Sequence, residues 1–273
     1  MIEINVGKYN LRGADWNDDD PRGIVHIWEP PRASANYVVA CDPSYGLASW
    51  DRALRTEDDE KTDNCAIQVI RVGTPDVQVA EYAAPIDAED AAGIVNFLGR
   101  MYAGTDEDGQ AHTIVEVQPG PGLLTQRELI NTFGYTNLYL WQYLDGMATQ
   151  DQKNTFGWRS SRQSRQMLWI RGTRHINKKG ITINSPYLVE EMTDLVLDNF
   201  LSFTARAQWG AHDDRMVAIL LGIWAANAWS FENAPEEAAK PEIVGAADYQ
   251  RTAISYEDMM DSWNDRFAAL HGE

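Results

Sequence analysis

The stretch Tyr37-Val-Val-Ala-Cys-Asp42-Pro-Ser-Tyr-Gly46 decides the fold, because five largely apolar residues precede a single aspartate. Apolar runs of this length are typical of a strand that is covered on both faces of a sheet. A proline and a glycine then end the run, as they do where strands meet loops. We therefore expect a buried strand that brings the Asp42 carboxylate to the rim of a sheet. An aspartate before a proline that only shapes a turn is the alternative.

Three strands joined by short connections come first in the predicted fold. Residues 37–42 precede 64–72 and 77–82, and hairpin connections make such neighbours antiparallel. The elements that follow are a helix over 87–102, a strand over 113–117, a helix over 123–133 and a strand over 138–141. This order predicts an α/β fold with a mixed central sheet of about five main strands, the first three antiparallel and the others in a parallel β-α-β arrangement, flanked by helices.

The later part of the chain is predicted to be mainly helical. The expected elements are a basic helix from Ser164, a short strand at 181–183, a helix over 186–199 and a buried helix within 211–229. Three parts are expected: an N-terminal leader or interdomain linker (1–34), one main domain (35–230) and an acidic, partly helical tail (231–273).

Charge is distributed unevenly along the 273-residue chain. The whole sequence carries −18, which by itself argues against a nucleic-acid partner. Residues 145–180, however, hold eight Lys or Arg against Asp145 and Asp151, a segment charge of +6. Such a basic stripe on an acidic protein can bind phosphates, and a solvated charged helix is the ordinary alternative.

The two cysteines and the hydropathy exclude some classes of protein. Cys41 and Cys65 lie in predicted strands and are expected to be free buried thiols, because no CxxC pattern accompanies them. The sequence has no run of eighteen apolar residues and no signal-peptide pattern. We therefore expect a soluble, unsecreted protein without a membrane partner.

Carboxylates from three predicted elements are the candidate functional residues. Glu116 lies in the strand 113–117, where burial of a lone carboxylate is costly, so we expect it at the exposed carboxyl end of that strand. Asp213 and Asp214 begin the last helix, where either can also be an N-cap. If these acids gather with Asp42, their repulsion favours hard divalent cations. Two Mg²⁺ or Mn²⁺ ions on such oxygen ligands suit phosphodiester hydrolysis.

Four segments in order resemble the nuclease domain of phage large terminases, which belongs to the RNase H-like superfamily. The resemblance covers about residues 25–230, and the last segment is the most specific. Gln118 departs from the asparagine that is usual in the second segment. The segments are Pro30-Pro31 with Tyr37–Gly46 and Asp63-Asn-Cys-Ala, Ile114-Val-Glu116-Val-Gln118-Pro-Gly120 leading to Leu124 and Leu129, Phe156-Gly157-Trp158-Arg159-Ser-Ser with Arg165, Ile181-Thr-Ile183 and Leu188-Val-Glu190-Glu191-Met192, and His212-Asp213-Asp214-Arg215-Met216-Val217-Ala218.

The resemblance implies a metal-dependent endonuclease that cleaves double-stranded viral DNA during genome packaging. It implies two metal ions held by Asp42, Glu116, Asp213 and Asp214, without distinguishing which member of the Asp-Asp pair is the principal ligand. It makes Asp63 an accessory acid and His212 a residue that orients a ligand, contacts the substrate or only caps a helix. The expected DNA-binding residues are Lys153, Arg159, Arg162, Arg165, Lys178 and Lys179.

The implied partners are double-stranded DNA, a terminase ATPase domain, the portal and the small terminase, at the procapsid portal in the host cytoplasm. The sequence has no GxxxxGK[ST] motif, so the expectation is limited to DNA cleavage by an isolated nuclease domain or a split-gene product. The alternatives are another RNase H-like nuclease, such as a junction resolvase, and a catalytically inactive module that docks to a portal or to DNA.

Overall fold

The computed structural model describes residues 1–5, 24–44, 64–117, 120–141, 155–199, 204–207 and 213–232. Residues 1–232 cluster into one compact unit. Residues 233–273, which include nearly all of the predicted tail, lie outside the described residues, and so do three of the predicted site residues, Asp63, Lys153 and His212.

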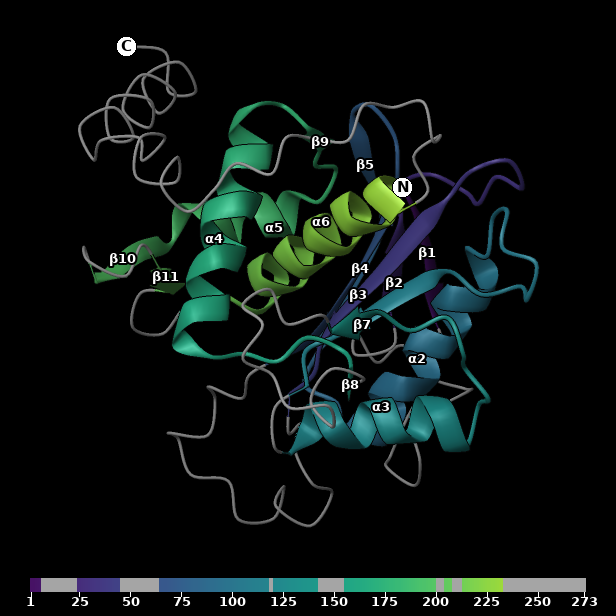
Figure 1. The fold of residues 1–273 in the computed structure, drawn as a ribbon. Coiled ribbons are helices and arrows are strands. Elements are labelled where there is room, and N and C mark those ends of the chain that lie inside the picture. Colours follow the sequence, from purple (N-terminus) through teal and green to yellow (C-terminus); the bar gives the residue numbers. More distant parts are fainter. Residues whose placement is uncertain are drawn as a thin grey trace. The chain divides into compact units, whose positions relative to one another are not determined.

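A mixed sheet lies at the centre of this unit (Figure 1). Among the described residues it has seven strands, in the order β1-β2-β5-β4-β3-β6, with β9 paired to β5. Their bounds are β1 (Ile2–Asn5), β2 (Ile24–Ile27), β3 (Tyr37–Asp42), β4 (Cys65–Arg71), β5 (Asp76–Ala84), β6 (His112–Val115) and β9 (Ile181–Thr182). Strands β3, β4 and β5 are antiparallel neighbours, and β6 is parallel to β3. The predicted α/β fold with a mixed sheet is confirmed, and two strands from residues 1–34 extend it.

Helices cover both faces of the sheet (Figure 1). Two of them, α2 (Ala88–Met101) and α3 (Pro121–Asn131), lie on one face, which we call the α2 face. The other face, which we call the α6 face, is covered by α4 (Arg162–Asn177), α5 (Pro186–Thr193) and α6 (Asp214–Glu232). Two short strand pairs form sheets of their own: β7 (Leu140–Trp141) with β8 (Thr155–Phe156), and β10 (Leu195–Asn199) with β11 (Thr204–Ala207). Residues next to β7 and β8 also bond to β6.

The residues of β3 explain why both faces are covered. Side chains of successive strand residues point to opposite faces, and all five residues before Asp42 are buried. Val39 and Cys41 pack in the core on the α2 face, whereas Val38 and Ala40 pack in the core on the α6 face. The apolar run that predicted a central strand therefore supplies two cores at once.

The predicted helix over residues 186–199 is wrong in its second half. Helix α5 ends at Thr193, where the Asp194 amide donates to the Glu191 carbonyl oxygen. Residues from Leu195 form β10 instead, because they pair with β11. This partner is later in the chain, so the local sequence does not reveal the pairing. The part of the chain that the structure describes has no helix that is long and apolar enough to cross a membrane.

Candidate functional site

Asp42 and Glu116 meet at the carboxyl ends of two adjacent strands. In the parallel pairing of β3 with β6, Cys41 lies opposite Val115, and the Glu116 amide donates to the Cys41 carbonyl oxygen at 2.9 Å. The next side chains of the two strands are therefore neighbours, and the carboxyl groups of Asp42 and Glu116 form a hydrogen bond. Strand β3 thus brings Asp42 to the rim of the sheet, as its sequence predicts.

The start of α6 brings a third carboxylate to the same rim. The Asn64 amide, immediately before β4, donates to Asp214 Oδ2 at 2.9 Å. Asp214 is buried and close enough to Asp42 to raise the pKa of that residue. Asp213 directly precedes α6, and its Oδ2 lies 3.8 Å from Arg165 Nη2. Asp214 therefore contributes to the electrostatic environment of Asp42.

The electrostatics of Asp42 reflect this crowding. Burial raises its pKa well above the ordinary value, and the nearby carboxylates of Glu116 and Asp214 raise it further. The Arg165 guanidinium opposes this rise of the pKa. Carboxyl groups held this close repel one another when they are charged. Such a cluster gains free energy from either a shared proton or a cation.

The acids are neighbours, but they do not converge on one point. Among the described residues, no group of three or more His, Cys, Asp or Glu side chains is arranged to hold a metal ion. Asp42 and Glu116 share a hydrogen bond, whereas Asp214 accepts from the Asn64 amide and Asp213 lies beside Arg165. Each carboxylate is thus held by its own contact, although the electrostatics join three of them.

The segment Gly157-Trp158-Arg159-Ser160 lies along the free edge of β6. The Trp158 amide donates to the Val115 carbonyl oxygen, and the Val117 amide donates to the Trp158 carbonyl oxygen, both at 2.7 Å. Gly157 has φ of 82°, and a Cβ there would lie 2.8 Å from the Val115 carbonyl oxygen. Only glycine fits this left-handed backbone at such a close approach. The glycine therefore lets the segment pair with β6.

Ser160 is a site residue to which the sequence motif gave no role. Its hydroxyl donates to Glu116 Oε1. The segment is fixed by Trp158, a fully buried ring that packs edge-on against Trp141 and Trp224 with centroids 4.6 and 4.7 Å away. Glu116 itself is only 5% exposed, so the expectation of an exposed strand end is wrong. The reason is the cover that Ser160 and its segment provide.

The start of α3 also lies close to Glu116. A Cβ at Gly122, in the first turn of α3, would lie 3.1 Å from the Val117 Cα and clash with the Glu116 carbonyl oxygen. The glycine and proline residues after Glu116 therefore allow the helix to begin directly against the backbone of this acid.

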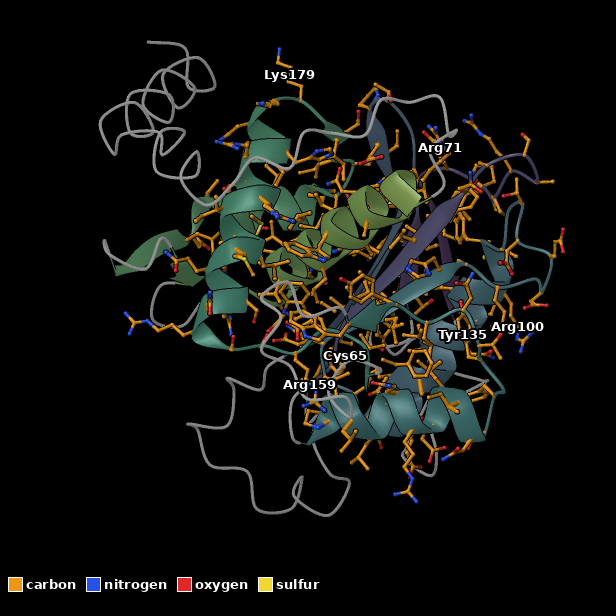
Figure 2. All side chains as sticks on the ribbon, viewed as in Figure 1. Cys65, Arg71, Arg100, Tyr135, Arg159 and Lys179 are labelled. Atoms are coloured by element: carbon orange, nitrogen blue, oxygen red, sulfur yellow. The ribbon has the colours of Figure 1, made fainter. Side chains whose placement is uncertain are left out.

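The predicted basic residues that the structure describes, which exclude Lys153, do not gather in one place. Arg162 begins α4 and Lys178 follows its last residue, so the 16-residue helix separates them by about 24 Å. Figure 2 shows Lys179 near the top of the view and Arg159 well below it, just above α3. Arg165, near the start of α4, lies beside the acids, with Nη2 3.8 Å from Asp213 Oδ2. The structure thus places part of the basic stripe beside the acids and the other part at the far end of α4.

Two further residues to which the sequence analysis gave no role lie behind the start of α6. The Met216 amide donates to Glu191 Oε1 of α5 at 2.7 Å. Burial raises the pKa of Glu191 to about 7, against the lowering effects of this hydrogen bond and of Arg215. The second residue is Glu81 of β5, which is fully buried and accepts from Arg215 Nε at 3.1 Å. The available sequence signal was Arg215, which directly follows the Asp-Asp pair. Its positive charge requires an acidic partner when it is largely buried.

Comparison of the sequence with protein-family models and with curated proteins finds no match. Function is therefore inferred from the residues themselves.

Proposed function

We propose that this protein is a metal-dependent endonuclease with an RNase H-like fold, which cleaves double-stranded viral DNA as the nuclease domains of phage large terminases do. The observation that carries the proposal is the cluster of Asp42, Glu116 and Asp214, in which burial and like charges raise the pKa of Asp42. A purely structural role accounts poorly for such a cluster, because apolar residues would stabilise the same positions at lower cost.

The chemistry of the donor set suits a hard divalent cation, although the described side chains are not gathered around one point. All of the clustered side chains offer carboxylate oxygens, which Mg²⁺ and Mn²⁺ prefer, and the mutual repulsion that raises the pKa of Asp42 is relieved by positive charge. Asp42, Glu116 and Asp214 would hold the ions, with Asp213 available on the same helical turn. When bound, two such ions activate water as the nucleophile and stabilise the charge of the leaving oxygen.

The remaining residues of the site would orient the acids and the substrate. Ser160 donates to Glu116 and so restricts the rotation of that carboxylate. Arg159, which is exposed, and Arg162 at the start of α4 are available to contact backbone phosphates next to the acids. Contacts to phosphates fix the position of a duplex without reading its sequence. This suits an enzyme that cuts at many places on viral DNA.

The fold supports the proposal at the level of element order. Three antiparallel strands, β3 to β5, precede the helix α2 and the parallel strand β6. This is the order on which the RNase H-like resemblance depends. The resemblance to terminases also implies an ATPase domain, the portal and the small terminase as partners. The protein would then act at the procapsid portal in the host cytoplasm.

A plasmid-nicking assay with Mg²⁺ or Mn²⁺ tests the proposal. The wild-type protein should cut, and Asp42→Asn should not. Glu128→Gln, an acid on the outer side of α3 that bonds to Thr132, is the matched control and should cut normally. An inactive wild-type protein that still binds duplex DNA would favour the docking module. Preference for a four-way junction over a linear duplex would favour a resolvase.

A further inference from the structure

The sheet surface beneath α6 carries a chain of buried polar side chains that the proposed chemistry does not use. Gln68, Gln78 and Glu81 are all fully buried. Gln78 Nε2 donates to Gln68 Oε1 at 2.7 Å, and Gln68 Nε2 donates to Glu81 Oε2 at 2.8 Å. Groups of this kind are costly unless every member is bonded, and a complete network fixes one arrangement of its parts.

The network ends on the start of α6. Arg215 Nε donates to Glu81 Oε1 at 3.1 Å, and Ser185 Oγ donates to the same oxygen at 3.0 Å. Arg215 Nη1 also lies 3.5 Å from Glu191 Oε2. One guanidinium therefore joins a carboxylate from β5 to a carboxylate from α5. Arg215 directly follows Asp214, so its position constrains that acid.

Glu191 holds the same turn through the main chain. The first amides of a helix have no partner within the helix, and Glu191 Oε1 accepts the one from Met216 at 2.7 Å. A carboxylate at this end also interacts favourably with the helix dipole. Two carboxylates therefore hold the first turn of α6. Glu81 of β5 binds Arg215, and Glu191 of α5 binds both Arg215 and the main-chain amide of Met216.

We propose that Glu81, Glu191 and Arg215 form a clamp that positions the Asp213-Asp214 pair for binding a divalent cation beside Asp42 and Glu116. The clamp rests on the proposed function, because its purpose is the placement of metal ligands. These three are positioning residues, since none of them belongs to the proposed ligand set. Sites of this kind need their ligands held within about 0.5 Å, which a network with fixed bond directions achieves better than apolar packing.

Arg71, an arginine of the sheet itself, provides a matched control. Arg71 Nε lies 3.2 Å from Glu29 Oε2, and the side chains of Arg71 and Arg215 are equally exposed, at 21%. Arg71 ends β4 at the opposite end from Cys65 (Figure 2) and hence from Asn64, whose amide holds Asp214. Comparing variants of Arg71 and Arg215 therefore separates the effect of losing any half-buried arginine–glutamate pair from the effect of losing the clamp.

The experiment compares Arg215→Lys and Glu81→Gln with Arg71→Lys. Lysine keeps the charge but cannot join two carboxylates through two edges of one planar group. Mn²⁺ affinity is measured by titration with electron paramagnetic resonance, and hydrogen exchange is measured at the first amides of α6. We expect Arg215→Lys and Glu81→Gln to weaken Mn²⁺ binding roughly 10- to 100-fold and to speed this exchange. Arg71→Lys should leave both unchanged.

Each outcome decides between the two ideas. If the wild-type protein binds no Mn²⁺ at the acids, the proposed function fails and the clamp has no ligands to position. If the wild type binds Mn²⁺ and the clamp variants bind it equally well, the clamp alone is overturned. An equal loss of Mn²⁺ affinity in Arg71→Lys also overturns the clamp, because the loss then reflects general stability. Should Arg215→Lys fail to fold, Glu191→Gln keeps an oxygen for the Met216 amide and tests the same clamp.

Discussion

The two faces of the sheet are built from the same strands but differ in the polar groups that they bury. On the α2 face, the buried polar contacts include a neutral hydroxyl pair, in which Thr113 Oγ1 donates to the Tyr135 hydroxyl, which donates in turn to the Ala111 carbonyl oxygen. On the α6 face, Glu81 is fully buried and pairs with Arg215. Buried ion pairs seldom stabilise a protein more than apolar packing does. The difference suggests that the α2 face serves stability and the α6 face serves the site.

Glu116→Gln should have the largest effect on activity and nearly none on folding. The glutamine side chain keeps an oxygen for the Ser160 hydroxyl but relieves the repulsion with Asp42. We expect DNA cleavage to fall by roughly 10²-fold or more, with the free energy of unfolding unchanged or raised. Cleavage rates and denaturant melts measure the two quantities. A strongly destabilised variant would make Glu116 a structural acid.

Leu98→Ala should do the reverse on the α2 face. Leu98 lies on α2 and is fully buried in the core of that face. Its truncation leaves a cavity, and we expect the free energy of unfolding to fall by about 2–5 kcal/mol. Mn²⁺ affinity of the folded variant should match that of the wild type. Weaker Mn²⁺ binding by the folded variant would contradict the inference that the α2 face serves stability and the α6 face serves the site.

Glu191→Gln tests the α6 face through pH. The pKa of Glu191 is about 7 in the folded protein, above its ordinary value of 4.5. Between these values the folded state holds a proton that the unfolded chain has lost, so wild-type stability falls as pH rises from 4.5 to 7. This titrating contribution, about 3 kcal/mol at most, should be absent from the variant. Melts of both proteins from about pH 4 to 8 measure it, and parallel curves would contradict it.

Arg159→Ala should have the smallest effect. If Arg159 contacts one phosphate, its removal weakens duplex binding equally for all sequences and lowers the salt slope by about one. Arg100→Ala on the α2 face is the control. Arg100 is an exposed arginine that bonds to Asn96 and to the Phe133 carbonyl oxygen, and Figure 2 shows it apart from Arg159. Equal losses of duplex affinity in the two variants would indicate that the DNA does not bind beside Arg159.

The strands and the acids could be predicted from local patterns, because each depends on residues near it in the sequence. The apolar run before Asp42 and the buried strand before Glu116 are examples. Ser160 and Glu191 could not be predicted, since their roles depend on contacts 44 and 25 residues away. The helix predicted beyond Thr193 failed for the same reason, as β10 exists only through its pairing with β11.

The edge of the sheet beside β6 is completed by two segments that are separate in the chain. The Thr113 amide bonds to the Asn137 carbonyl oxygen and the Tyr139 amide to the Thr113 carbonyl oxygen, whereas Trp158 pairs further along, with Val115 and Val117. Both ends of the connection from 139 to 157 are therefore fixed by β6 itself. Within this connection β7 pairs with β8, so the number of residues between Trp141 and Thr155 is free to vary without moving Glu116. Among related chains, the spacing between the Glu116 segment and the Trp158 segment should thus tolerate insertions, while the spacing from Trp158 to Ser160 should not.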